Sequence, residues 1–245
     1  MVGILSDVGN VRSINEDSVG YFKGDNKSIY VIADGMGGHN AGEVASKIAV
    51  DTTINYIKTQ YKDESVKDMK YILIKGIECA NKKIYDLAQS NKSLKGMGTT
   101  ITACLIKEST MLVANVGDSR CYVIKDNKIV KVTKDHSLVQ QLVDNGSISE
   151  EEAIYHPNKN VITRALGTNK IVDIDVYKID LKDIKKVILC TDGLTNEVTT
   201  KEIENIVTNN DNEKSCRELI KLSKLKGGRD NISVIVFEGE CKDDR

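Results

Sequence analysis

Acidic residues recur in this sequence at the ends of short apolar runs, most of them beside glycine. The set consists of Asp34, Asp118, Asp192 and Asp230, and the pair Glu16-Asp17 joins it from a polar N-terminal segment. Acids are depleted in strands and are costly to bury without a partner. If the strands share one core, their ends can converge, and convergent carboxylates repel one another unless cations lie between them. The pattern therefore predicts a cation site.

Ligation by oxygen alone restricts which cations the site would hold. Carboxylates suit Mg²⁺, Mn²⁺ or Ca²⁺ better than zinc or copper. Six acids exceed what one Mg²⁺ normally uses, because Mg²⁺ keeps several waters, so we expect two or more ions. The alternative is a group of unrelated turn acids, since a single Asp-Gly turn is common. The repetition of the arrangement disfavours that alternative.

The stretch from Tyr30 to His39 shows how such a site is presented. Tyr30–Ala33 predicts a short buried strand, which delivers Asp34 on rigid backbone. Gly35 and the glycines after it let the main chain approach whatever Asp34 holds, because they lack a Cβ. His39 follows this turn and could act as an acid or orient water, while an ordinary surface histidine fits the position equally well.

Arginines near these motifs are candidates for holding a phosphate. Two metals in a carboxylate cluster commonly activate a water and clamp a phosphoryl group, which an arginine fork can grip as well. The chain has six arginines among 35 basic residues. Arg12, in the polar N-terminal loop, is the best candidate phosphate ligand. Arg120 could bind phosphate or be structural, Arg229 could orient Asp230 or lie on the surface, and His136 is a weaker candidate acid for which a structural role is favoured.

The hydrophobic pattern predicts strands interrupted by two pairs of helices. Strands are expected at about residues 2–7, 18–22, 30–33, 99–106, 111–116, 120–125, 128–132, 172–179, 186–190 and 231–237. Helices are expected at about residues 41–60, 65–89, 200–207 and 213–225. This order indicates a layered α+β sandwich, not repeating βαβ units. The polar segment at about residues 137–160 is expected to form a flap inserted between core elements.

Composition bounds the class of protein. With 245 residues, 40% of them hydrophobic, the chain can bury a sizeable core, and we expect a single domain over residues 1–245. A net charge of -1 argues against a nucleic-acid binder. The six cysteines lack CxxC spacing, which indicates reduced thiols in a cytosolic protein. No window approaches a membrane span of about 20 apolar residues, and the richness in lysine, asparagine and isoleucine suggests a bacterial source.

Eight short motifs occur in order along the chain. They are RSINED, ADGMGGH, GMGTT, NVGDSR, KDHS, ITRALG, CTDGL and GGRDNISVIV. Together they resemble the metal-dependent protein phosphatases of type 2C, in their bacterial serine/threonine branch, from about Asp7 to Phe237. The resemblance implies a four-layer α-β-β-α sandwich, in which a central antiparallel β-sandwich is flanked by helices and carries a small flap. It also implies a dinuclear Mg²⁺ or Mn²⁺ site at one end.

Seven positions match residues that bind metal in that family. They are Glu16, Asp17, Asp34, Gly35, Asp118, Asp192 and Asp230. Asp34 resembles the acid that bridges both ions, and Gly35 resembles the carbonyl ligand of one. Asp192 and Asp230 look like ligands of the other ion.

The remaining metal positions match residues with supporting roles in the family. Glu16 and Asp17 resemble acids that hold waters on the ions. Asp118, together with Asp192, matches the acids of a third ion in bacterial members. No ligand position carries a residue unable to bind metal, so an inactive relative is not expected.

The expected reaction is hydrolysis of phosphoserine or phosphothreonine in proteins by a metal-activated water. The cofactors would be Mn²⁺ or Mg²⁺, as two ions with room for a third. The catalytic candidates are Arg12 as the phosphate clamp, Asp34, and His39, which follows the Asp-Gly turn like the proposed acid of other branches although that turn is longer here. A cysteine nucleophile is disfavoured, because no cysteine lies in a glycine-rich phosphate cradle.

Expected partners are phosphorylated proteins, including a serine/threonine kinase whose action a monomeric, cytoplasmic signalling enzyme would reverse. One alternative is a phosphoesterase acting on small phosphate metabolites. Another is a catalytically silent regulatory or binding module of the same fold, which the intact ligand positions disfavour. A third is a sporulation or stress-response phosphatase acting on one anti-sigma-factor antagonist, although 245 residues leave no room for its usual sensor regions.

Overall fold

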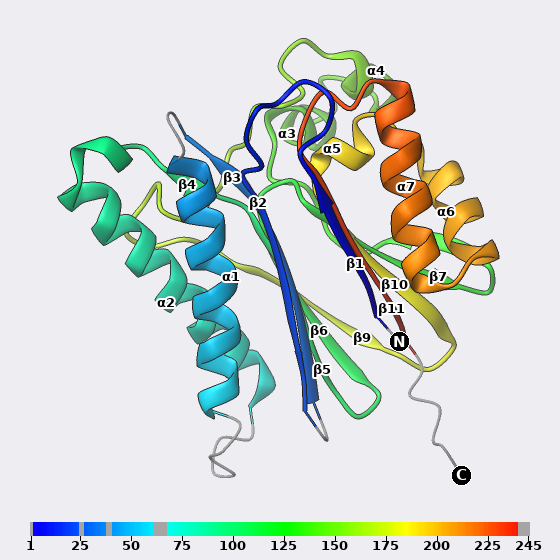
Figure 1. The fold of residues 1–245 in the computed structure, drawn as a ribbon, viewed down its shortest axis with the longest axis horizontal. Coiled ribbons are helices and arrows are strands. Elements are labelled where there is room, and N and C mark those ends of the chain that lie inside the picture. Colours follow the sequence, from blue (N-terminus) through cyan, green and yellow to red (C-terminus); the bar gives the residue numbers. More distant parts are fainter. Residues whose placement is uncertain (1, 25–26, 38–40, 61–67, 240–245) are drawn as a thin grey trace.

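Two antiparallel β-sheets pack face to face at the centre of the protein (Figure 1). The computed structural model describes residues 2–24, 27–37, 41–60 and 68–239. The first sheet has the strand order β1-β11-β10-β7-β8, and the second has β2-β3-β5-β6-β9, with β4 paired to β3. The strands are β1 (Val2–Asp7), β2 (Asp17–Lys23), β3 (Lys27–Met36), β4 (Gly98–Thr99), β5 (Ile101–Lys107), β6 (Thr110–Val116), β7 (Arg120–Lys125), β8 (Lys128–Lys131), β9 (Asp175–Asp180), β10 (Ile184–Cys190) and β11 (Ile232–Glu238).

Helices cover the outer face of each sheet. Against the second sheet lie α1 (Ala41–Gln60) and α2 (Met69–Ser90), and against the first lie α6 (Thr200–Asn209) and α7 (Asn212–Lys226) (Figure 1). The shorter elements are α5 (Asp192–Thr195) and the 3₁₀ helix η1 (Lys92–Leu94). The layers therefore run helix, sheet, sheet, helix, which confirms the predicted α+β sandwich.

Three buried clusters hold these four layers together. One fills the space between α1, α2 and the second sheet, and another fills the space between the first sheet and its helices. The third lies between the two sheets, where the rings of Tyr30 and Phe237 stack with centroids 3.8 Å apart. The strands that face two layers, β3 and β11, are almost wholly apolar, because both of their faces are buried.

Helix boundaries follow local capping. Asp68 caps α2 by accepting hydrogen bonds from the amides of Lys70 and Tyr71, so this helix starts later than the predicted residue 65, and residues 65–67 lie outside the described part of the chain. Helix α7 begins after Asp211, whose carboxylate caps it, and ends at Gly227 with a positive φ. The predicted helix at 41–60 matches α1.

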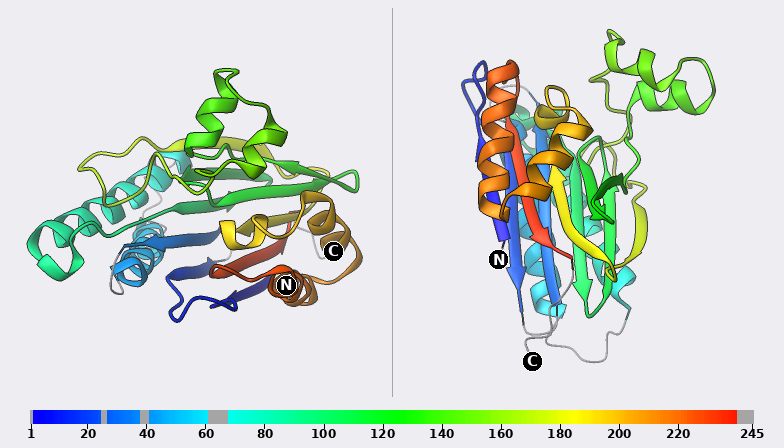
Figure 2. Two further views of the ribbon diagram at one scale, coloured as in Figure 1. Left: turned by 90° about the horizontal axis from the view of Figure 1, so that it is seen from above. Right: turned by 90° about the vertical axis from the view of Figure 1, so that its right-hand side faces the viewer.

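The segment predicted as a flap stands apart from the sandwich, as the right-hand view of Figure 2 shows. It contains α3 (Leu138–Asp144) and α4 (Glu150–Tyr155), the latter opened by a capping box of Ser149 and Glu152. Ile154 and Tyr155 are exposed on α4. The two ends of the flap meet at a β-bridge between Ser137 and Ile162.

One strand differs from its predicted extent. Strand β3 continues through Met36 because β4, which was not predicted, pairs with its end, placing Gly35 opposite Thr99. Asp34 therefore lies within the paired strand and not at its end, so its backbone is held on both sides.

Two other sequence-based expectations concern the chain as a whole. Within the described residues, no helix combines the length and apolar character needed to cross a membrane. Five of the six cysteines lie in the described part of the chain, and each is an unpaired thiol.

Candidate active site

Strand pairing places two of the predicted acids side by side. Asp17, the first residue of β2, is the cross-strand partner of Asp34 in β3. Antiparallel register fixes such partners only about 5 Å apart at their Cα atoms. Asp17 is buried and Asp34 is half-buried, so two carboxylates share one poorly solvated corner of the sandwich.

Hydroxyl groups from the other sheet hold one oxygen of Asp17. Thr191 Oγ1 donates to Asp17 Oδ2 at 2.9 Å, and Ser233 Oγ donates to the same oxygen at 2.6 Å. Oδ1 of Asp17 is buried and has no hydrogen-bond partner. A buried carboxylate oxygen without a partner is unfavourable, so this atom is suited to a ligand that the protein itself does not supply.

The backbone of Asp34 is fixed by the two threonines of the GMGTT motif. Its amide donates to Thr100 Oγ1 at 2.9 Å, and its carbonyl accepts from Thr99 Oγ1 at 2.8 Å. Thr100 Oγ1 also lies 2.8 Å from Ser119 Oγ, next to Asp118 in sequence. Buried hydroxyls thus tie the strand of Asp34 to the turn that carries Asp118.

Glu16 and Gly35 meet the N-terminal end of α1. The amide of Gly35 donates to the carbonyl of Glu16 at 3.1 Å, and the amide of Gly42 donates to the Glu16 carboxylate. A Cβ at Gly35 would lie 2.1 Å from the Gly42 carbonyl oxygen, so only glycine fits here. The absence of a side chain lets strand, loop and helix converge beside the carbonyl of Gly35, as its predicted role as a backbone ligand requires.

Asp192 and Asp230 complete the group on the first sheet. Asp192 opens α5 directly after β10, and its carboxyl shares a hydrogen bond with that of Asp34. Asp230 lies in the loop before β11, and its Oδ2 is 2.9 Å from Nη2 of Arg12. Arg12 is 51% exposed, so the candidate phosphate clamp lies at the surface beside an acid of the cluster.

The loop that carries Arg12 is held by Asn231. This buried side chain donates to the carbonyls of Val8 and Ile14 at 3.0 and 2.9 Å, and its Oδ1 accepts from the amide of Glu16 at 2.8 Å. One side chain therefore positions both ends of the segment between Val8 and Glu16, next to Asp230 in the sequence.

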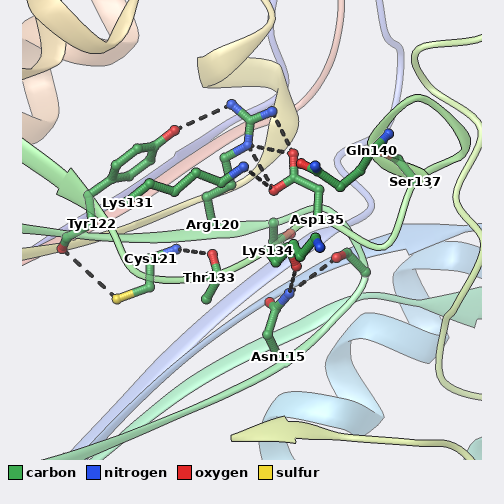
Figure 3. Close-up of polar contacts among 12 residues, drawn as sticks. Asn115, Arg120, Cys121, Tyr122, Lys131, Thr133, Lys134, Asp135, Ser137 and Gln140 are labelled. Carbon is green, nitrogen blue, oxygen red and sulfur yellow. Dashed lines mark hydrogen bonds and ion pairs between the residues drawn. The ribbon is translucent and has the colours of Figure 1, made fainter. Parts of the chain in front are cut away.

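Asp118 is buried at the turn between β6 and β7, and its Oδ1 has no hydrogen-bond partner. The neighbouring Arg120 does not extend to this carboxylate. Its Nε and Nη2 contact Asp135 Oδ2 at 2.9 and 2.7 Å, and Lys131 Nζ lies 2.7 Å from Asp135 Oδ1 (Figure 3). Of the two roles considered for Arg120, the geometry favours the structural one.

The other candidate side chains lie away from the acids. Arg229 is 81% exposed and lies 3.8 Å from Glu197, which favours the surface alternative. His136 is buried at the base of the flap, beside Arg164. His39 lies outside the described residues, so its predicted role stays a prediction.

The acids of this corner strongly influence one another. Burial, followed by the carboxylates of Asp17, Asp192, Asp118 and Asp230, raises the pKa of Asp34 well above its usual range. Burial is also the main cause that raises the pKa of Asp17 to about 7 and that of Asp118 to about 8. Burial and the charge of Asp230 raise the pKa of Asp192. The fold has therefore gathered carboxylates that cannot all be ionised without added positive charge.

These residues fit divalent cations. All the donors are oxygens, and two buried carboxylate oxygens, on Asp17 and Asp118, lack partners. Within the described residues, no group of three or more His, Cys, Asp or Glu side chains already encloses an ion. The acids are thus assembled at one end of the sandwich, and closure around a cation would require small side-chain movements.

Sequence reasoning identified the acids but missed the hydroxyls that hold them. The missed residues are Thr99, Thr100, Ser119, Thr191 and Ser233. Each lies inside a motif that was singled out, and a polar residue flanked by apolar strand residues was the available signal.

We expect Mn²⁺ to stabilise the protein more at high pH than at low pH. Because the folded-state pKa values of Asp17 and Asp118 are raised, these carboxyls favour folding only while protonated, and that contribution is lost as pH rises through about 7 to 8. A bound cation offsets the resulting repulsion. The gain in Tm on replacing EDTA with Mn²⁺ should therefore be larger at about pH 8.5 than at about pH 6. An equal gain at both values would contradict this electrostatic account.

Comparison with known proteins agrees with the motifs. The protein phosphatase 2C family profile matches residues 10–224. Serine/threonine phosphatase stp of Listeria welshimeri serovar 6b is 40% identical over 241 residues, which cover 95% of this chain and 93% of that protein. The crystal structure of the Mycobacterium tuberculosis serine/threonine phosphatase PstP/Ppp has a TM-score of 0.86 at 35% identity, covering 96% of this chain and 97% of that one.

A structure with metal is also similar. The catalytic domain of the serine/threonine protein phosphatase PstP, solved in complex with two manganese ions, has a TM-score of 0.81 at 34% identity and covers 96% of both chains. The matches span almost the whole chain and agree with the order of its eight motifs. The chain belongs to the protein phosphatase 2C family.

Proposed function

We propose that this protein hydrolyses phosphoserine and phosphothreonine in other proteins, using Mn²⁺ held by the acidic corner. The observation that carries the proposal is the convergence of Asp17, Asp34, Asp118, Asp192 and Asp230 on one another's charge at one end of the sandwich. The similarity to phosphatases named for serine and threonine supports the substrate class.

The ions would be held by oxygen ligands from both sheets. Asp34 would bridge two ions, with the Gly35 carbonyl on one and Asp192 and Asp230 on the other. The two manganese ions of the related PstP structure support this number. Mg²⁺ as an alternative cation would use the same oxygens.

The other acids would support this pair of ions. Glu16 and Asp17 would hold ordered waters, and Asp17 is already fixed by Thr191 and Ser233. Asp118 would contribute to a third ion, for which its partnerless Oδ1 is suited.

The reaction transfers the phosphoryl group from a serine or threonine oxygen to water. When bound, the ions supply positive charge that acidifies water and neutralises the phosphate. Arg12 would donate hydrogen bonds to the phosphate oxygens, since its ion pair with Asp230 uses Nη2 and the guanidinium carries further N–H donors. The hydroxyls behind Asp17 and Asp34 keep the carboxylates in place, so little reorganisation is needed during the reaction. His39 is the candidate donor of a proton to the leaving oxygen.

The biological setting follows from the same proposal. We place the protein in the cytoplasm of a bacterium, as a monomeric signalling enzyme that reverses a serine/threonine kinase. The relatives reported above are bacterial serine/threonine phosphatases, which supports this setting. A catalytically silent binding module is disfavoured, because every acid of the cluster is present.

Replacing Arg12 with Ala should raise the KM for a phosphopeptide by about 10-fold or more, with a smaller effect on kcat, because a charge-assisted bidentate contact to phosphate is lost. Arg12→Lys should restore the charge but only part of the affinity. Arg229→Ala is the matched control, since that arginine is exposed and points to Glu197. An unchanged KM in Arg12→Ala would remove Arg12 from the substrate site.

The substrate class is tested by comparing phosphothreonine and phosphoserine peptides with a small aryl phosphate ester in the same Mn²⁺ buffer. We expect kcat/KM to be higher for the peptides, because residues flanking the phosphate can contact the surface around Arg12 and the flap. A higher value for small phosphate metabolites would favour the phosphoesterase alternative.

A further inference from the structure

His136 connects the base of the flap to the turn that carries Asp118. The two chain ends of the flap meet directly after and before this residue: Ser137 bridges Ile162, and the amide of Thr163 donates to the His136 carbonyl at 2.8 Å. Two further contacts reach Gly117, which immediately precedes Asp118. The amide of His136 donates to the Gly117 carbonyl at 2.9 Å, and the amide of Gly117 donates to His136 Nδ1 at 3.1 Å.

The Gly117 turn has little freedom of its own. Its φ is +109°, and a Cβ there would lie 2.5 Å from Thr100 Cγ2, so the peptide is held in a conformation that only glycine accepts without strain. Asn115 donates to the Gly117 carbonyl at 3.2 Å. The side-chain acceptor for the Gly117 amide, however, is His136 Nδ1, which leaves this imidazole as the group that fixes the direction of the peptide entering Asp118.

The second ring nitrogen is also engaged. His136 Nε2 lies 3.2 Å from Asp175 Oδ2 and 3.1 Å from Arg164 Nη1, while Arg164 Nη1 donates to Asp175 Oδ1 at 2.8 Å. Because Nδ1 accepts from Gly117, the proton of the neutral ring must be on Nε2, where Asp175 accepts it. Burial lowers the pKa of His136, which favours this neutral form, while the facing charges of Arg164, Asp175 and Asp135 partly offset one another.

We propose that His136 is a positioning residue for the cation site that includes Asp118, acting through the hydrogen bond from the Gly117 amide to its Nδ1. This inference rests on the proposed metal role of Asp118. Without that acceptor, the buried Gly117 amide would lose its partner, and the peptide could rotate to find another. The Asp118 carboxylate, which has a partnerless Oδ1 in the buried corner, would then be set less accurately for a cation.

The two ring nitrogens can be separated by substitution. The amide oxygen of an asparagine can take the place of Nδ1, whereas a glutamine reaches the position of Nε2. His136→Asn should therefore keep the bond to Gly117, and His136→Gln should keep only the contact with Asp175. His136→Ala loses both. The matched control is His156→Ala, because His156 Nδ1 also accepts a backbone amide, that of Asn158 at 3.1 Å, but does so within the exposed flap.

The test is Mn²⁺ binding to the chelated full-length protein, followed by the electron paramagnetic resonance signal of free Mn²⁺. Asp118→Asn serves as the reference and should weaken one class of bound ion. We expect His136→Ala and His136→Gln to weaken the same class by about 10-fold or more, as loss of a supporting contact does at metal sites. His136→Asn and His156→Ala should bind Mn²⁺ as the unchanged protein does. Thermal melts of each variant confirm that the fold is retained.

The possible failures can be told apart. If the unchanged protein binds no Mn²⁺, or if Asp118→Asn binds it normally, the proposed metal role of Asp118 is wrong and the inference fails with it. If Asp118→Asn weakens one ion class while His136→Ala and His136→Gln do not, the inference alone is wrong. Equal losses in all three His136 variants would show that the ring acts by packing and not through Nδ1.

Discussion

Asp34→Asn is expected to lower kcat/KM for a phosphopeptide by about 10³-fold or more, which corresponds to about 4 kcal/mol of transition-state stabilisation. The substitution keeps the size of the side chain but removes the charge at the centre of the acidic corner. Four other carboxylates contribute to the raised pKa of Asp34, so no other position combines so many acid neighbours with a proposed bridging role. The measurement is steady-state phosphate release at saturating Mn²⁺.

The same variant offers a second readout that separates lost chemistry from lost folding. Removing a buried charge relieves repulsion, so in EDTA at about pH 8 the Tm of Asp34→Asn should equal or exceed that of the unchanged protein. Asp51→Asn, on the exposed face of α1, is the matched control and should change neither quantity. Full activity in Asp34→Asn would overturn the assignment of the bridging carboxylate.

The largest expected effect on stability is in Asp135→Ala. Asp135 is 8% exposed and pairs with both Arg120 and Lys131, so its removal leaves two partly buried cations without their carboxylate (Figure 3). Breaking one side of a buried ion pair costs about 3 kcal/mol, which for a chain of this size lowers Tm by about 6 to 12 °C. Differential scanning calorimetry in EDTA would measure the change without a contribution from metal.

Asp86→Ala provides the control for that experiment. Asp86 pairs with Lys82 on the exposed surface of α2, with side-chain exposures of 58% and 74%, so solvent already screens the pair. No measurable change in Tm is expected. If Asp135→Ala were as stable as Asp86→Ala, the Arg120–Asp135 pair would not be the anchor between β7 and the flap that the contacts indicate.

The sequence indicated the acids of the site because carboxylates are chemically out of place at the ends of buried strands. Asp34, Asp118 and Asp192 could each be found from their own local apolar run, without knowledge of the fold. The layer order could be predicted for the same reason, since helix and strand periodicities are local.

The contacts that hold the site could not be predicted in this way. The Arg120–Asp135 pair joins residues separated by β7, β8 and a turn, and the bonds from Thr191 and Ser233 to Asp17 join positions in different sheets. Such partners depend on the register between strands and on how the two sheets face each other. The short β4 was missed because two residues carry no periodicity, although its pairing determines that Asp34 lies inside β3.

The central claim is that the acidic corner holds the cations on which phosphatase activity depends. The most direct test is release of phosphate from a phosphothreonine peptide by protein stripped with EDTA, before and after Mn²⁺ is added back. The account predicts no turnover in the stripped protein and recovery when Mn²⁺ is restored. Undiminished turnover in excess EDTA, or no turnover with any divalent cation although the protein is folded, would contradict it.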